Sequence, residues 1–211
     1  MGWSIRLVYS VVMLLRADAE LVQIVDAASA DAARRSGTWL KCRPGCTQCC
    51  HGVFALSQLD ALRLRAGLRE LEQSDPERAL AVRSRAEQSR LRLSAQFPGD
   101  PATGILYDSE EDAFEDFAND EPCPVLDPTT GTCDLYAARP MTCRVFGPPI
   151  RSEDGIGVCE LCFDGASEQE IVAAELNMDW SPLEDSLNAE AEGDSGFHGT
   201  TIVAFALLSQ P

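Results

Sequence analysis

The segment CRPGCTQCC, residues 42–50, places four cysteines within nine residues around a Pro-Gly turn. Its C-x-x-C spacing at residues 46–49 occurs again at residues 159–162. Two cysteines spaced in this way around a turn can direct both sulfurs at one point about 2.3 Å away, as in zinc and iron-sulfur sites. The segment therefore predicts a metal-binding loop region around which the rest of the chain folds.

The remaining cysteines support this interpretation. Cysteine makes up 9 of 211 residues, about 4%, which is below the roughly 8 to 10% of small disulfide scaffolds. Buried packing of the thiols, or a disulfide framework in an exported protein, are the alternatives. Because we expect all nine in turn-rich loops outside every predicted helix, metal ligation is the favoured interpretation. The candidate ligands are Cys42, Cys46, Cys49, Cys50, Cys123, Cys133, Cys143, Cys159 and Cys162.

Length and charge exclude several classes of protein. A chain of 211 residues with 45% hydrophobic and 24% charged residues is typical of one globular domain, or one and a half. The net charge is -17, and it is unevenly spread: residues 1–92 carry 14 bases and 10 acids, whereas residues 93–211 carry 3 and 24. Binding to nucleic acid or to anionic lipid needs a contiguous basic surface. We therefore expect a metal ion as partner, no nucleic acid and no membrane, while a protein partner stays unknown.

An apolar run at residues 7–15 is too short to span a bilayer, which needs about 20 residues. It fits a packed terminal segment, or an overlong start with Met13 as the true initiator. A signal peptide cut near residues 17–19 is the alternative. Because export would expose the clustered thiols to oxidation, we expect a cytoplasmic protein.

Helices are predicted on both sides of the cysteine region. Leu21, Ile24, Val25 and Ala28 recur at helical spacing within residues 18–35. Serines followed three residues later by an acid, at 57, 74, 167 and 181, predict helix starts. They place helices near 58–72, 75–96, 168–178 and 182–191. Burial is expected for Leu59, Leu62, Leu71, Leu80, Val82 and Leu91, and for the tail at residues 200–208, as strand or helix.

Residues 97–165 show no helical or strand period and contain eight prolines. Within them, residues 108–121 hold eight acids and no base, which predicts a solvated or partly disordered loop, with a carboxylate metal site or docking surface as alternatives. Metal ligation would hold such an irregular stretch together. The predicted fold is mainly α, with several short helices packed around an irregular, Cys-rich metal-binding loop region. We divide it into an N-terminal segment and helix (1–36), a metal-binding domain (37–165) with an inserted helical pair (about 57–97), and C-terminal helices with an apolar tail (166–211).

The pattern of residues 42–162 resembles the YkgJ-type cysteine-cluster family, bacterial proteins described as a zinc- or iron-chelating domain. The resemblance rests on a C-x-x-C-x-x-C-C opening, a Cys-Pro-x-Leu segment at 123–126 and a C-x-x-Y-x-x-R-P-x-x-C-R-x-F motif at 133–146. In the opening, three residues rather than two separate Cys42 from Cys46. The resemblance implies metal binding, with zinc or iron as cofactor and an iron-sulfur cluster as one form of it.

Four thiolates around a divalent ion leave a net charge of -2, which the fold must compensate. Arg139 and Arg144 flank Cys143, and we expect their guanidinium groups to donate hydrogen bonds to thiolates or to Asp134. We expect Tyr136 to shield the site from water. Tyr136, Arg139 and Arg144 are therefore predicted to belong to the cofactor-binding site.

Two classes of function follow. The first is a non-catalytic module that stores, delivers or senses metal. The second is an iron-sulfur redox or radical-type enzyme, such as a relative of protein lysine N-methylases, because residues 42–49 match the C-x3-C-x2-C spacing of radical enzymes. Gln48, in place of an aromatic residue, and the lack of a strand-helix repeat weigh against the radical enzyme. No hydrolase elbow or nucleotide-binding loop is present in the sequence.

Overall fold

The computed structural model describes residues 5–152 and 155–208, so residues 1–4 and 209–211 of the predicted end units lie outside the described part. The described residues form eight α-helices and three two-stranded antiparallel ladders of two or three residues a strand. The helices are α1 (Ile5–Ser36), α2 (Gln58–Ser74), α3 (Pro76–Leu93), α4 (Glu111–Glu115), α5 (Met141–Val145), α6 (Glu168–Ala174), α7 (Ser181–Ser195) and α8 (Val203–Ala206). The strands are β1 (Gly99–Asp100), β2 (Ile105–Leu106), β3 (Leu126–Asp127), β4 (Thr132–Cys133), β5 (Ile150–Ser152) and β6 (Gly155–Gly157). The mainly α fold is confirmed.

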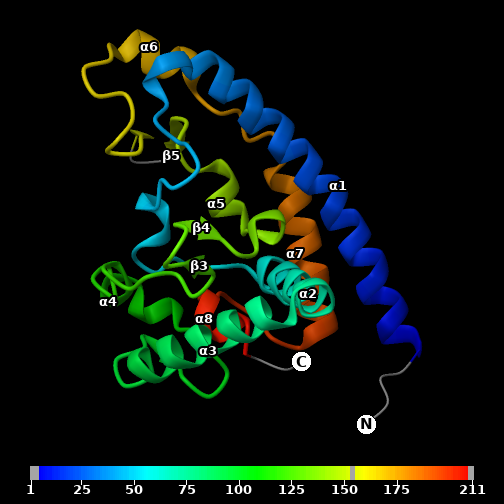
Figure 1. Cartoon of the computed structure of the whole chain (residues 1–211). Coiled ribbons are helices and arrows are strands. Elements are labelled where there is room, and N and C mark those ends of the chain that lie inside the picture. The colour runs from blue at the N-terminus through cyan, green and yellow to red at the C-terminus, as the bar shows by residue number, and fades with distance from the viewer. Residues whose placement is uncertain (1–4, 153–154, 209–211) are drawn as a thin grey trace.

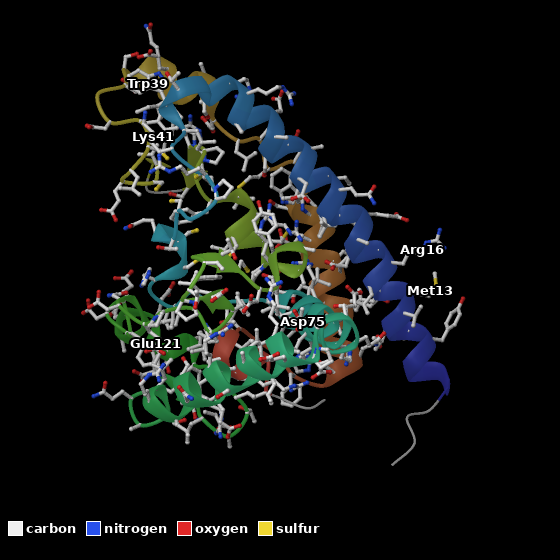
Figure 2. All side chains as sticks on the ribbon, viewed as in Figure 1. Met13, Arg16, Trp39, Lys41, Asp75 and Glu121 are labelled. Atoms are coloured by element: carbon white, nitrogen blue, oxygen red, sulfur yellow. The ribbon has the colours of Figure 1, made fainter. Side chains whose placement is uncertain are left out.

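Helix α1 runs along one side of the molecule, with α7 beside it and α6 at its C-terminal end (Figure 1). It begins well before residue 18, because no proline or glycine interrupts the chain until Gly37. Its buried stripe is Leu14, Leu21, Val25 and Ala32, whereas Ile24 is exposed, contrary to expectation. Met13 and Arg16 project from the outer face of this helix (Figure 2). Among the described residues, no helix combines the length and the apolar character needed to cross a bilayer.

Helices α2 and α3 form a hairpin that packs on α8. Ser57 caps α2 by accepting from the Asp60 backbone N–H, as predicted. Asp75, not Ser74, caps α3, because α2 extends through Ser74. Leu80 and Leu91 are exposed, since they fall on the outer face of α3, whereas Val82 is buried. The hairpin therefore presents an apolar inner face to the tail.

The tail is buried, as expected, and the helical alternative holds: α8 and its neighbours fill the core beneath α2 and α3. Thr201 pairs with Leu56 in an antiparallel bridge. Phe205 stacks on Phe97 with ring centroids 4.4 Å apart. The tail thus joins the helical hairpin to the irregular region.

The acidic run contains a short helix, α4, rather than loop alone. Phe117 is buried and meets Phe97 edge to face, with centroids 6.0 Å apart. This aromatic contact anchors the run. Its acids are exposed except Glu121, which pairs with Arg92.

Helices α6 and α7 start differently. Ser167 and Glu170 form the predicted capping box of α6. Helix α7 has Trp180 at its N-cap position, and Ser181 instead donates to the carbonyl of Met178 at 3.0 Å. The predicted cap at Ser181 is therefore wrong.

Candidate metal centre

The nine cysteines lie in two groups, drawn from different parts of the chain. The first group consists of Cys42, Cys46, Cys159 and Cys162. Burial raises the pKa of the Cys42 thiol to about 12, and the other three thiols, which lie close to it, add to the rise. Burial also raises the pKa of Cys159, with Cys162 and Cys46 contributing. The structure thus brings two segments more than 100 residues apart to one place.

Turns shape the first group. The Cys46 N–H donates to the carbonyl of Arg43 at 2.9 Å, with Gly45 at φ 85°, a conformation open to glycine. The Cys162 N–H donates to the carbonyl of Cys159 at 2.8 Å. The Lys41 N–H in turn donates to the sulfur of Cys162 at 3.3 Å, the type of contact that stabilises a thiolate.

Two strained or crowded backbone positions adjoin the first group. Phe163, directly after Cys162, has φ 60°, which is costly for a residue with a bulky side chain. Its N–H donates to the carbonyl of Trp39 at 3.2 Å, and Trp39 and Lys41 lie on the segment that follows α1 (Figure 2). A Cβ at Gly147 would lie 2.8 Å from the sulfur of Cys42, so glycine leaves room for that sulfur.

The second group consists of Cys49, Cys50, Cys123, Cys133 and Cys143. A hydrogen bond between Cys49 and Cys50 lowers the pKa of Cys49 to about 6 and raises that of Cys50. Burial raises the pKa of the other three, to about 12 for Cys123, and nearby Cys49 contributes to each rise. Five thiols from four segments therefore share one region.

Regular elements, rather than loops alone, position the second group. Cys49 and Cys50 lie in a 3-10 turn, Gln48–Cys50, Cys133 ends β4, and Cys143 lies within α5. The Cys123 N–H donates to the carbonyl of Cys50 at 2.8 Å, which ties the Cys-Pro segment to the opening motif. The expectation that all nine cysteines are in loops is therefore wrong for these four, because short elements also form between the prolines.

Arg139 lies beside the second group. Its positive charge contributes to lowering the pKa of Cys49 and opposes the rise at Cys133. Its guanidinium lies 4.1 Å from the ring centroid of Tyr136 and donates to the carbonyl of Tyr136 at 3.3 Å. The Tyr136 side chain is 64% exposed, so this ring packs on Arg139 at the surface.

Arg144 is buried and turned towards α1. Its guanidinium donates to both carboxylate oxygens of Asp26 at 2.9 Å and to the carbonyls of Ala137 and Arg139. Asp134, the other expected partner of the arginines, pairs instead with Arg78 and Arg85 on α3. The partners of Arg144 and Asp134 therefore lie on helices α1 and α3, which the spacing of the cysteines does not predict.

The donor chemistry of both groups suits zinc or iron. Soft thiolates are the preferred ligands of Zn²⁺ and of iron-sulfur centres. None of the nine cysteines forms a disulfide. Within residues 5–152 and 155–208, no set of three or more Cys, His, Asp or Glu side chains is drawn together closely enough to hold an ion as it stands. The match of these residues to zinc or iron therefore rests on their thiol donors and on the way the structure groups them.

A helical frame around segments that bring several thiols together fits a cysteine-based metal-binding domain. The sequence model of the CxxCxxCC family, described as "Putative zinc- or iron-chelating domain", matches residues 41–162, more than half of the chain. The chain belongs to this family, which confirms the resemblance found in the sequence. Comparison with curated proteins and with solved structures found no match.

Sequence reasoning missed three residues around this centre: Asp26, Asp60 and Arg63. Asp60 and Arg63 are buried on α2, and Asp26 is half-buried on α1. A charged residue on the apolar side of a predicted helix is the signal that could have found them.

Proposed function

We propose that the chain binds two metal ions, one in each cysteine group, as a non-catalytic metal-handling module. The observation that carries the proposal is the division of nine thiols into two groups of four and five. Four thiolates complete a tetrahedral shell around one zinc or iron ion. Cys42, Cys46, Cys159 and Cys162 supply that number in the first group.

In the second group, four thiols would ligate and one would remain. Cys49 lies close enough to Cys123, Cys133 and Cys143 to raise the pKa of each of them. Cys50 contacts Cys49 through the hydrogen bond between them. Cys123 and Cys133 also raise the pKa of Cys50. Because the hydrogen bond from Cys50 lowers the pKa of Cys49, we assign Cys50 as the fifth thiol, which supports the thiolate of Cys49 rather than holding the ion.

The radical-type enzyme is disfavoured by the same grouping. Its C-x3-C-x2-C motif must direct three sulfurs at one cluster, whereas here Cys42 and Cys46 lie in the first group and Cys49 in the second. The described strands also form three separate ladders of two strands each, not a barrel.

Metal analysis of protein purified without oxygen, with an absorption spectrum of the same sample, tests the proposal. We expect two equivalents of zinc or of iron without acid-labile sulfide. Metal-free protein that stays folded would refute metal binding. Iron with acid-labile sulfide would show that the protein holds an iron-sulfur cluster instead of single ions.

Paired substitutions test the grouping. Cys159→Ser with Cys162→Ser is expected to remove one equivalent, and Cys133→Ser with Cys143→Ser the other, with circular dichroism as the control for folding. If each pair of substitutions removed both equivalents in a folded protein, two independent sites would be refuted.

A further inference from the structure

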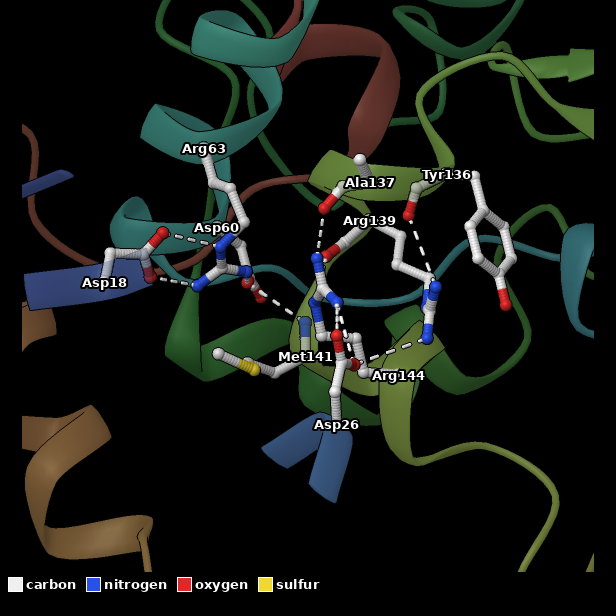
Figure 3. Close-up of polar contacts among 9 residues, drawn as sticks. All are labelled: Asp18, Asp26, Asp60, Arg63, Tyr136, Ala137, Arg139, Met141 and Arg144. Carbon is white, nitrogen blue, oxygen red and sulfur yellow. Dashed lines mark hydrogen bonds and ion pairs between the residues drawn. The ribbon is translucent and has the colours of Figure 1, made fainter. Parts of the chain in front are cut away.

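Helix α1 lies outside the residues that the family model matches, yet it is tied by ion pairs to the segment that carries the second cysteine group. Asp26 of α1 accepts from Arg144 at 2.9 Å and from Arg139 at 3.5 Å (Figure 3). The Arg144 side chain is only 2% exposed, whereas that of Asp26 is 45% exposed. The aspartate therefore neutralises a buried cation that lies next in sequence to Cys143.

A second connection runs from α1 through α2. Asp18 accepts from Nε of Arg63 at 2.7 Å, and Arg63 also pairs with Asp60 (Figure 3). Asp60 then accepts from the backbone N–H of Met141 at 3.0 Å. Met141 is the first residue of α5, and the preceding Pro140 provides no side-chain cap. Asp60 thus caps α5 from another helix, as an N-cap residue would.

The start of α5 is thus held from α2, which Arg63 ties to α1, and its last turn is held from α1 directly. The apolar contacts agree, because Leu21 and Val25 of α1 share a core with Met141 and Val145 of α5. Cys143 lies between these two anchored ends, and Arg139, held by the same Asp26, acts on the thiols of the second group. A shift of α1 would therefore move a thiol and a counter-charge together.

We propose that α1 is part of the second metal site: Asp26 positions Arg144 and Arg139, and through them α5 and Cys143, so that docking of α1 and metal binding stabilise each other. The inference rests on the proposed two-site function. Coupling of this kind is reciprocal, since a helix that strengthens metal binding is itself held more firmly when metal is bound.

The first test compares Asp26→Asn with Asp31→Asn. Asp31 lies on the same helix and also pairs with two arginines, Arg34 and Arg35, but at the exposed end away from the second group. Cobalt titration of the metal-free full chain, followed by the thiolate charge-transfer band and by competition with a chelator, measures each site. Loss of a group that supports metal ligands typically costs 10- to 100-fold in affinity.

We expect Asp26→Asn to weaken one of two cobalt sites about tenfold or more and Asp31→Asn to leave both unchanged. The weakened site must be the one that still binds cobalt in the double variant Cys159→Ser, Cys162→Ser. Equal binding by the two variants, or equal weakening of both sites in Asp26→Asn, would overturn the inference. If the unsubstituted chain bound no metal, the proposed function would fail instead.

The second test uses the unsubstituted chain and so does not depend on the folding of Asp26→Asn. Amide hydrogen exchange in residues 14–32 is expected to slow when zinc is added. It should not slow in Cys133→Ser with Cys143→Ser, in which the second site is removed. Exchange in α1 that is independent of zinc would overturn the coupling.

Discussion

Replacing Gly67 by alanine tests how closely α2 approaches the segment between Cys133 and Cys143. Gly67 lies on α2 and faces Ala138 in the 3-10 turn Tyr136–Ala138. A Cβ at residue 67 would lie 2.3 Å from the Cβ of Ala138. Two carbon atoms need about 3.5 to 4.0 Å, so the turn or the helix must move by more than 1 Å.

The size of the effect follows from two opposing terms. Glycine to alanine within a helix normally stabilises by about 1 kcal/mol, because alanine has less freedom to lose on folding. Overpacking a filled interface costs about 1 to 3 kcal/mol. The net change expected for Gly67→Ala is therefore a destabilisation of about 0 to 2 kcal/mol. Gly193→Ala is the matched control, because Gly193 lies in α7 with no atom within 4 Å of its Cβ position, and it should stabilise by up to about 1 kcal/mol.

Urea unfolding of the two variants, under the same metal conditions, measures both free energies of unfolding. Ala138→Gly added to Gly67→Ala removes the clash and should recover most of the loss. If Gly67→Ala stabilised the protein as much as Gly193→Ala does, the close approach of α2 would be refuted. The same variant should weaken metal binding at the second group, since the displaced turn leads into Arg139 and α5.

Three further predictions concern charge and ligation. Arg63→Met should cost about 3 to 5 kcal/mol in a denaturant titration, because it leaves Asp18 and Asp60 buried without their shared cation; a change below 1 kcal/mol would show that the pairs do not stabilise the fold. Burial, and secondarily Asp60, raise the pKa of Glu184 above 4.5, so the folded state binds this proton more tightly than the unfolded state and loses stability as pH rises through the folded pKa. Glu184→Gln removes that loss, and because the half-exposed group is screened by solvent, the expected gain is below about 1 kcal/mol at pH 7 and vanishes below pH 4.5 in thermal melts; equal gains at both pH values would contradict this origin. Cys50→Ser should retain two metal equivalents whereas Cys49→Ser retains one, by metal analysis of folded protein, and loss of an equivalent in Cys50→Ser would make Cys50 a ligand.

Local patterns predicted the helices well because their signals are short-range. The caps at Ser57 and Ser167 are hydrogen bonds between residues three apart, which sequence spacing specifies directly. The errors at Ser74 and Ser181 arose where a neighbouring residue, Asp75 or Trp180, took the cap position. The exposure of Leu80 and Leu91 could not be predicted, because it depends on which face of α3 meets α2 and α8. The division into three units along the chain stays a prediction.

The sequence by itself determined that this is a mainly helical protein with a cysteine-based metal-binding region, because turn residues, C-x-x-C spacing and helix periodicity act over a few residues. Only the tertiary structure decided which thiols lie together. Cys46 and Cys49 are three residues apart, yet they belong to different groups, since each pairs with a segment brought near by the packing of the helices. The roles of Asp18 and Asp26 were likewise decided in space: a carboxylate on α1 can neutralise a buried arginine 118 positions along the chain only after both helices have packed.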